Sequence, residues 1–252
     1  MSDLTNKVVL VTGASRGIGR ALAEGVAQHG ADVIICDLPR ESKGLSEVQS
    51  AIEKLGRKCC LFGVDITDKS AVENMVAQAT KQAGHIDVLV NNAGILKPSL
   101  LEELSESDWD AHFAVNGKGL LFVTNAVLPQ MRQRKNGRII NIASIAARQG
   151  VPTQGHYAAT KATAVTLTRV YAQETGMDGI TVNAICPGII LTEMGKNNLG
   201  SEEAINHWKE VAALKRLGEP SDIVGPVVFF ASDLSSFVTG QALNVCGGIY
   251  FH

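Results

Sequence analysis

The feature that most constrains the fold is a glycine-rich turn near the N-terminus. The apolar run 8–11 is followed at once by Thr12-Gly-Ala-Ser-Arg-Gly-Ile-Gly19 and then by a helical stretch that we expect to end near Gln28. A strand, a glycine turn and a helix start in this order form a phosphate cradle, because missing Cβ atoms let a ligand approach backbone N–H groups at the positive end of a helix. The spacing is Gly-x-x-x-Gly-x-Gly, which differs from Gly-x-Gly-x-x-Gly and lacks the Lys-Ser/Thr ending of an ATP-binding loop. The alternative is a purely structural turn.

Strand and helix patterns alternate along the rest of the chain, without a sizeable linker. We expect strands at 8–11, 32–37, 58–65, 87–90, 138–144, 180–186 and 242–245, and helices ending near residues 28, 55, 83, 135, 175, 213 and 232. This alternation predicts one α/β domain over residues 1–252, with a Rossmann-type, doubly wound, parallel seven-stranded sheet flanked by helices. Ligands bind such sheets at the carboxyl ends of the strands. Residues 189–217 are the expected substrate-loop region, with one helix at 201–213.

Polar or turn-forming residues follow most of the expected strands. Asp37, eighteen residues after Gly19, is placed to bind a ribose diol and to repel a 2′-phosphate, which favours NAD over NADP. Arg16 and Arg40 argue the other way, since either could reach a phosphate. Asp65 could accept from an adenine amine or be a solvated loop residue. The turn Asn91-Asn-Ala-Gly94 could lock adjacent strands, contact a cofactor, or do both.

The segment from Ser144 to Lys161 has the clearest chemical pattern. On a helix, Tyr157 and Lys161 lie four residues apart and therefore on one face. We expect the Lys161 charge to lower the pKa of the Tyr157 phenol, and Ser144 to add a hydroxyl from the preceding strand. In the long helix expected at 107–135, Asn116-Gly-Lys-Gly119 predicts either a local distortion or close packing against a neighbour.

Composition excludes several other classes of function. The 252 residues include 23 basic and 25 acidic side chains, giving a net charge of −2, and neither nucleic acid nor a membrane is an expected partner. The five cysteines lack metal-ligand spacing and lie mostly in apolar runs, which predicts buried thiols and no metal site. The N-terminus shows no signal or spanning segment, so we expect a cytoplasmic protein.

Taken together, these motifs resemble the short-chain dehydrogenase/reductase family over essentially the whole chain. Thr12–Gly19, Asn91–Gly94, Ser144, Tyr157-x-x-x-Lys161 and Pro187-Gly188 occur in the family's order and spacing. The resemblance implies that Tyr157 is the general acid/base, Lys161 binds the nicotinamide ribose, Ser144 polarises the substrate oxygen and Asn116 holds a relay water. It also implies a homotetramer in which long helices pair across subunits. The implied NAD contacts are Gly13, Ser15, Arg16, Gly17, Ile18, Gly19, Asp37, Asp65, Ile66, Asn92, Ala93, Gly94, Tyr157, Lys161, Pro187, Gly188, Ile190 and Thr192.

The substrate is less well defined by the sequence. We expect the pocket to be lined by Leu96-Lys97-Pro98 and by the loops at 145–156 and 189–208. These loops carry polar residues, among them Arg148 and Gln154, which we predict contact the substrate together with Ser144 and Tyr157. This favours a small polyol, sugar or hydroxy acid, interconverted between secondary alcohol and ketone. One alternative is a 3-oxoacyl-(acyl-carrier-protein) reductase. Another is a non-catalytic NAD-sensing regulator, which would not need an intact Ser, Tyr and Lys set.

The chain departs from the family's pattern near its C-terminus. Cys246 stands where the family usually has Asp, just before Gly247-Gly248. We expect this change to affect C-terminal packing or a subunit contact and to leave the catalytic residues intact. The residues after Gly248 are expected to form a surface tail or, in a tetramer, to cover a neighbouring pocket.

Overall fold

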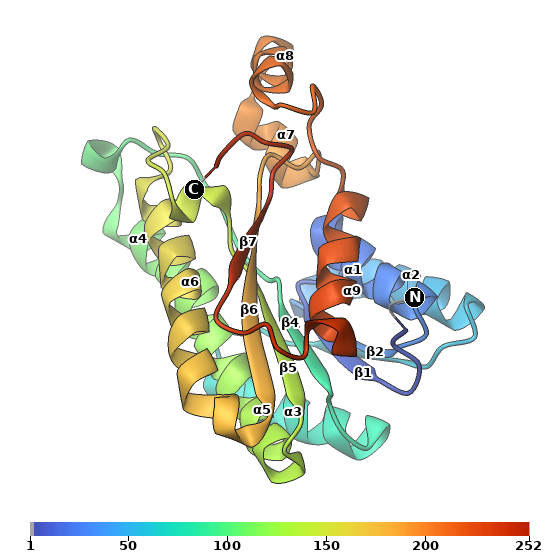
Figure 1. Ribbon diagram of the computed structural model, residues 1–252. Coiled ribbons are helices and arrows are strands. Elements are labelled where there is room, and N and C mark those ends of the chain that lie inside the picture. The colour runs from blue at the N-terminus through green and yellow to red at the C-terminus, as the bar shows by residue number, and fades with distance from the viewer. Residues whose placement is uncertain (1–2, 252) are drawn as a thin grey trace.

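A seven-stranded parallel sheet forms the centre of the molecule, in the order β3-β2-β1-β4-β5-β6-β7 (Figure 1). The structure is a computed structural model, and it describes residues 3–251. Strand order reverses between β1 and β4, so the carboxyl ends of these two strands flank the switch point at which such sheets bind ligands. The strands are β1 (Val8–Thr12), β2 (Asp32–Asp37), β3 (Cys59–Gly63), β4 (Val88–Asn91), β5 (Gly137–Ile142), β6 (Ile180–Pro187) and β7 (Ala242–Val245).

Helices cover both faces of the sheet. One face carries α1 (Gly17–Gln28), α2 (Ser42–Lys54) and α9 (Val224–Ala231), and the other carries α3 (Lys69–Ala83), α4 (Glu106–Phe113), α5 (Leu120–Arg134) and α6 (Gly155–Thr175). Two further helices, α7 (Glu193–Leu199) and α8 (Glu202–Val211), project beyond the sheet at the top of Figure 1. The predicted fold is therefore confirmed.

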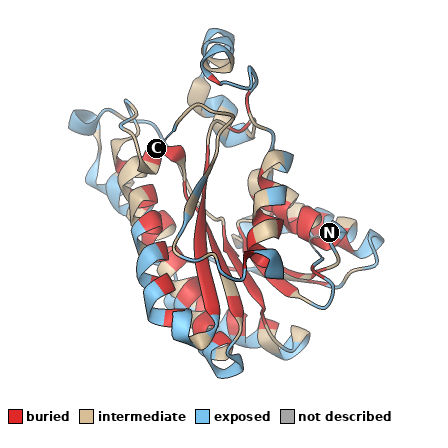
Figure 2. Cartoon of the chain, in the orientation of Figure 1, coloured by how far each residue is buried: buried red, intermediate tan, exposed pale blue. Residues whose placement is uncertain are grey.

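The central strands β1, β4, β5 and β6 are buried between the two helical layers, as the red ribbons of Figure 2 show, whereas the edge strands β3 and β7 are only partly buried. Successive strand residues contribute to opposite faces: Val9 and Val11 pack with α1 and α9, while Val8 and Leu10 pack with α3 and α5. Parallel strands buried on both faces are continuously apolar, which explains why these short β-branched runs could be read from sequence.

Several element boundaries differ from those predicted. Helix α2 begins at Ser42, directly after a 3-10 turn that starts at Pro39, whereas the expected polar helix began five residues later. Residues 191–217 contain two helices instead of one, and Thr192 caps the unexpected α7 by accepting from the Gly195 N–H at 3.1 Å. Strand β5 ends at Ile142, two residues before Ser144.

The distortion predicted around Asn116 is present. A π-helical segment, Ala114–Gly119, joins α4 to α5 in one continuous helical run. Close packing is present too, because a Cβ at Gly119 would lie 2.5 Å from Ile66 Cδ1. Both explanations of the interior glycines therefore hold at once.

Candidate active site

The glycine turn lies at the switch point and is completed by the turn that follows β4. Gly13 has a φ of +65°, and a Cβ there would lie 2.8 Å from Ala93 Cα. Thr12 Oγ1 accepts from the backbone N–H groups of Asn92 at 3.0 Å and Ala93 at 3.1 Å. The Asn92 amide in turn donates to the carbonyls of Thr12 and Gly13. The predicted strand lock is therefore present, and it closes one side of the cradle.

The start of α1 has the properties of an anion site. Arg16 is the N-cap residue, but its side chain makes no capping hydrogen bond, and the first turn contains no acidic residue. A Cβ at Gly19 would lie 2.0 Å from the Gly13 carbonyl oxygen, so only glycine allows this tight turn. The backbone N–H groups at Gly17, Ile18 and Gly19 begin the helix and have no partner within it. They fit a cofactor phosphate.

Asp37 lies at the end of β2 beside the glycine turn. Its Oδ2 accepts from the Ser15 N–H at 3.0 Å and the Ser15 hydroxyl at 2.6 Å, and its Oδ1 accepts from the Leu38 N–H at 2.8 Å. These bonds hold the carboxylate at the edge of the cradle. The two arginines that argued for NADP are paired with acids, Arg16 with Glu193 at 3.2 Å and Arg40 with Glu41 at 3.7 Å.

The residues expected near an adenine ring lie after β3. Asp65 is exposed, and its Oδ1 accepts from both the backbone N–H and the hydroxyl of Thr67. This arrangement matches the solvated loop residue that was one of the two interpretations. Ile66 is buried and packs against Gly119 of the π-helical segment.

Tyr157 and Lys161 occupy successive turns at the start of α6, and Ser144 faces them from the loop after β5. Lys161 is buried; its Nζ lies 5.7 Å from the centre of the Tyr157 ring and donates to the Ile142 carbonyl at 2.9 Å. The Ser144 side chain hydrogen-bonds to the Tyr157 side chain and accepts from the Ala146 N–H at 3.1 Å. The structure therefore brings the predicted hydroxyl, phenol and ammonium groups together.

The pKa values of this cluster correct one expectation. Burial raises the pKa of Tyr157 to about 12, while the hydrogen bond with Ser144 acts in the lowering direction. Burial also lowers the pKa of Lys161 to about 8. Because burial dominates and the Lys161 ammonium is directed to a backbone carbonyl, the predicted lowering of the Tyr157 pKa by Lys161 is absent in this structure.

Asn116 joins the π-helical segment to the loop after β4. Its Oδ1 accepts from the Ile95 N–H at 2.8 Å, and its Nδ2 donates to the Ile95 carbonyl and the Thr160 hydroxyl, each at 3.0 Å. A Cβ at Gly94 would lie 3.2 Å from Asn116 Oδ1 and 3.3 Å from Lys161 Nζ. Asn116 is thus adjacent to the ammonium group, as a relay role requires, and it also fixes the backbone of Ile95.

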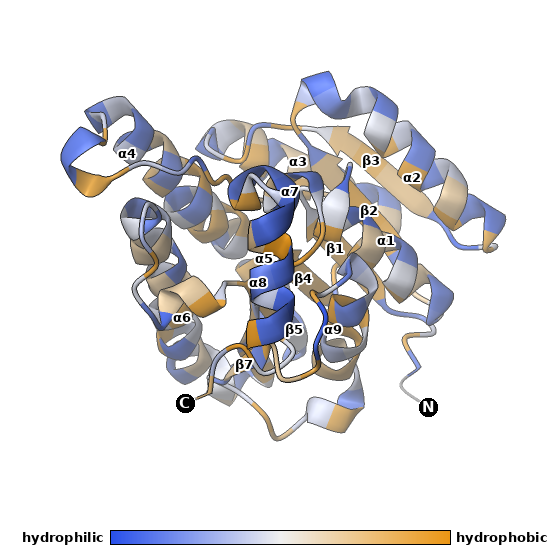
Figure 3. Ribbon diagram, turned by 90° about the horizontal axis from the view of Figure 1, so that it is seen from above, coloured by the Kyte–Doolittle hydropathy of each residue, from blue (hydrophilic) through white to orange (hydrophobic). Residues whose placement is uncertain are grey.

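The loop after β6 lies beside the glycine turn. Pro187 is the last residue of β6, and a Cβ at Gly188 would lie 2.7 Å from Cys246 Cβ. Ile190 is buried and pairs with Gly218, while Thr192 would contact a Cβ at Gly17 at 3.3 Å. Helices α7 and α8 then lie over the carboxyl edge of the sheet, seen from above in Figure 3.

Arg148 and Gln154, two of the four residues predicted to contact substrate, have protein partners. The Arg148 guanidinium donates to the Ala242 carbonyl of β7, and the Gln154 amide donates to Asn198 Oδ1 of α7 at 3.1 Å. Arg148 therefore joins the loop after Ser144 to the last strand, and Gln154 joins the start of α6 to the substrate-loop region. Their substrate contacts remain predictions.

The C-terminal residues pack back on their own chain. The Tyr250 hydroxyl donates to the Arg148 carbonyl at 3.2 Å, and the Cys246 thiol donates to the Tyr250 carbonyl at 3.5 Å. Cys246 thus acts in C-terminal packing, as expected. The tail still lies at the surface, with Phe251 77% exposed, and it contacts the loop that follows Ser144.

Two residues that contact parts of the site were not singled out by sequence reasoning. Glu193 forms an ion pair with Arg16 of the glycine turn, and His112 contacts His156 from α4. No motif marks either residue; a histidine directly before Tyr157 was the one available signal.

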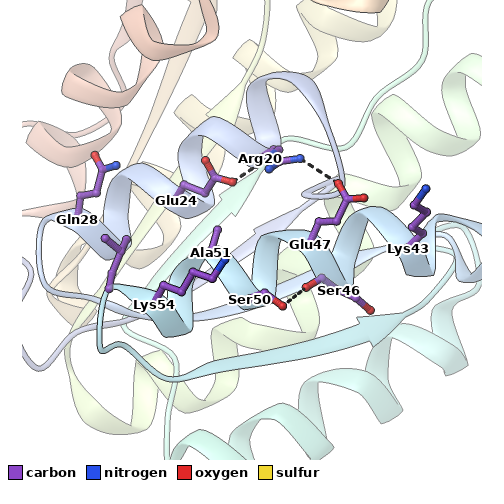
Figure 4. Close-up of a pocket in the computed structure, with 10 residues that line it drawn as sticks. Arg20, Glu24, Gln28, Lys43, Ser46, Glu47, Ser50, Ala51 and Lys54 are labelled. Atoms are coloured by element: carbon purple, nitrogen blue, oxygen red, sulfur yellow. Dashed lines mark hydrogen bonds and ion pairs between the residues drawn. The ribbon is translucent and has the colours of Figure 1, made fainter.

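A surface groove of about 890 Å³ between α1 and α2 contains none of the predicted site residues and is crossed by ion pairs from Arg20 to Glu24 and Glu47 (Figure 4).

Fold and site together define a dinucleotide-binding α/β protein with Ser144, Tyr157 and Lys161 clustered at the carboxyl edge of its sheet. A family model described as enoyl-(acyl carrier protein) reductase matches residues 13–250. The chain belongs to the short-chain dehydrogenase/reductase family of nicotinamide-dependent oxidoreductases.

Relatives within this family carry different activities in their names. The chain is 40% identical to a 3-oxoacyl-[acyl-carrier-protein] reductase of Staphylococcus epidermidis, over 97% of this chain and 99% of the relative. It is 41% identical to an L-rhamnose 1-dehydrogenase (NAD(P)(+)) of a Sphingomonas species, over 99% and 98%. The solved carveol dehydrogenase of Mycobacterium avium, in complex with NAD, superimposes with a TM-score of 0.93 at 28% identity, covering 99% of both chains.

No helix within residues 3–251 is long and apolar enough to cross a membrane. The same residues contain no group of three or more histidine, cysteine or acidic side chains arranged to hold a metal ion.

Proposed function

We propose that this protein is an NAD-dependent oxidoreductase that interconverts a secondary alcohol and a ketone on a small polar substrate. The observation that carries the proposal is the cluster of Ser144, Tyr157 and Lys161 beside the glycine turn. A hydroxyl, a phenol and an ammonium around one space can bind a substrate oxygen and move its proton. The bound nicotinamide would supply the hydride acceptor or donor.

In the proposed mechanism, Tyr157 is the general acid/base. Its raised pKa keeps the phenol protonated at neutral pH, which is the state needed to protonate a carbonyl oxygen during reduction. Ser144 orients the same oxygen through its hydroxyl. Lys161 binds the nicotinamide ribose. Asn116, adjacent to Lys161 Nζ across Gly94, holds the relay water.

NAD is the proposed cofactor because of the charges at the end of β2. Asp37 places a carboxylate beside the cradle, and a 2′-phosphate there would meet like-charge repulsion. Arg16 and Arg40, the cations that could offset this repulsion, are already paired with Glu193 and Glu41. The remaining proposed cofactor contacts are the residues given above at the glycine turn and after β3, β4 and β6.

A second function has comparable support, since several relatives are named 3-oxoacyl-[acyl-carrier-protein] reductase at about the same identity as the sugar dehydrogenases. A polyol, sugar or hydroxy acid remains our proposal because of the polar residues around the pocket. The NAD-sensing regulator is disfavoured by the complete Ser, Tyr and Lys cluster.

The experiment is an initial-rate panel of polyols, sugars, hydroxy acids and an acyl-carrier-protein thioester, each with NAD(H) and NADP(H). Tyr157→Phe is the matched variant, and we expect it to lose about 10²-fold or more of the turnover while NADH affinity changes less than about twofold. Thioester reduction with NADPH alone would select the second function. NADH binding without turnover on any substrate would select the regulator.

We further propose a homotetrameric, cytoplasmic protein in which the chain works as one domain. All five cysteines are free thiols, which fits a reducing compartment. The exposed face of α6 carries Val170, and Met177 lies almost fully exposed just beyond its end. Apolar side chains on an otherwise polar face support pairing of long helices between subunits.

A further inference from the structure

Two buried histidines form hydrogen bonds with the backbone of the loop that follows β4. His112 of α4 and His156 of α6 are 1% and 0% exposed, and their rings meet edge to face with centroids 4.3 Å apart. His156 is the residue directly before Tyr157. Neither histidine takes part in the mechanism proposed above.

The hydrogen bonds define the tautomer of each ring. His112 Nδ1 lies 2.6 Å from the Asp108 carbonyl oxygen, which can only accept, so Nδ1 carries the proton. His112 Nε2 is therefore the acceptor for the Lys97 N–H at 3.1 Å. His156 Nε2 lies 2.9 Å from the Lys97 carbonyl oxygen and must donate to it. One histidine thus binds the N–H of Lys97, and the other binds its C=O.

The same loop is fixed two residues earlier by Asn116, which binds both the N–H and the C=O of Ile95. Leu96, one of the residues expected to line the substrate pocket, lies between these two fixed backbone positions. The loop also contacts the segment before α6, where the Thr153 carbonyl accepts from the Ser99 N–H at 2.8 Å. The pocket wall and the first turn of α6 are therefore held together.

We propose that His112 and His156 are positioning residues that hold the backbone of Lys97 and thereby fix Leu96, a residue expected to line the pocket, beside the turn of α6 that carries Tyr157. The catalytic consequence of this inference rests on the proposed function. The hydrogen bonds from the two histidines to Lys97 do not depend on turnover. It further makes the loop sensitive to acid. Protonation of His112 Nε2 would turn the acceptor into a donor that faces the Lys97 N–H, and this hydrogen bond would be lost.

The groups around His112 set the direction of this response. Burial lowers the pKa of His112, and the charges of His156 and Lys97 act in the same direction. The hydrogen bond to the Asp108 carbonyl and the Asp108 carboxylate oppose it. The neutral, accepting ring is therefore the native form at neutral pH. The hydrogen bond from the Lys97 N–H to His112 is therefore complete above the ordinary histidine pKa. It is lost as the pH falls through the lower pKa that His112 has in the folded protein.

The test is hydrogen exchange of the Lys97 amide in the intact protein, at about pH 5.5 and about pH 7.5, with exchange times corrected for the chemical rate. We expect wild type to lose about tenfold or more of its protection at the lower pH. His112→Gln keeps an acceptor that cannot titrate, and its protection should not depend on pH. His112→Phe should be unprotected at both pH values. His85→Gln, at the opposite edge beside Asp87, should behave as wild type.

Steady-state kinetics supply the second readout, with the substrate identified by the panel. In His112→Phe, KM for the substrate should rise about tenfold while NADH affinity stays within about twofold. In wild type, protonation of His112 should lower kcat/KM at acid pH. In His112→Gln, this decrease should be absent. Wild-type protection that is independent of pH, or a His112→Gln profile like that of wild type, would overturn the proposal. Failure of the panel would leave the exchange result standing, so the two proposals fail separately.

Discussion

At the scale of single residues, two opposing effects act on the pKa of Tyr157. Burial raises the pKa of its phenol to about 12, and the hydrogen bond with Ser144 acts against that rise. The phenol is therefore a ready proton donor at neutral pH but a poor acceptor. The two directions of the proposed reaction should consequently respond differently to pH.

We expect the rate of alcohol oxidation to rise between about pH 7 and about pH 9, because the accepting phenolate increases about tenfold for each pH unit below the pKa. The rate of ketone reduction should show no such rise, since its proton donor is already present. Initial rates in both directions at saturating cofactor measure this difference. A flat oxidation profile in wild type would contradict the assignment of Tyr157.

At the scale of elements, the π-helical segment Ala114–Gly119 positions more of the site than its length suggests. It presents Asn116 to the Ile95 backbone and to Thr160 of α6, and it brings Gly119 against Ile66. One irregular turn therefore links the loop after β3, the loop after β4 and the helix that carries Tyr157.

Two glycines of this segment offer a matched pair of variants. Gly119→Ala should lower the free energy of unfolding by about 1–3 kcal/mol, because its Cβ would lie 2.5 Å from Ile66 Cδ1. Gly117→Ala should be neutral or should stabilise the protein by up to about 1 kcal/mol, since the nearest atom to its Cβ is 3.9 Å away and alanine favours helix. Urea unfolding curves of both variants measure the difference. Equal stabilities would show that Ile66 moves aside at little cost.

The elements that sequence predicted well have signals in their own residues. Strand β7 (Ala242–Val245) and the end of α3 at Ala83 were found because apolar runs and helix periodicity are local patterns. Helix α7 was missed because its residues are polar and include a glycine, so that its cap at Thr192 is the main signal. The site followed the same rule: motif residues could be placed, whereas the pairing of Asp37 with Ser15 and the desolvation that raises the pKa of Tyr157 depend on packing across elements.

At the scale of the whole molecule, the surface retains apolar residues that a single chain does not cover. Val170 and the exposed Gln173 lie on one face of α6, and the exposed Met177 lies just beyond the end of that helix. Pairing of this face with a second copy would cover all three residues. The proposed tetramer therefore predicts that a charge on this face separates the subunits.

Light scattering after size exclusion should give four times the chain mass for wild type and a smaller assembly for Val170→Glu, because a buried unpaired carboxylate opposes association. Leu55→Glu is the control: Leu55 is 45% exposed, against 44% for Val170, but it lies at the end of α2 on the other face of the sheet. Unchanged mass in Val170→Glu, or loss of the tetramer in Leu55→Glu, would argue against pairing through α6.

The hydrogen bond between Thr12 and Asn92 has a consequence for the stage of folding at which the cofactor site forms. These residues are 80 positions apart in the chain, and the contact closes the cradle around Gly13. Contacts of such long sequence separation form late, because the loop between them must first be ordered. A nascent chain therefore carries the glycines of its cofactor site long before it can bind the cofactor, and binding competence arrives only once β4 pairs with β1.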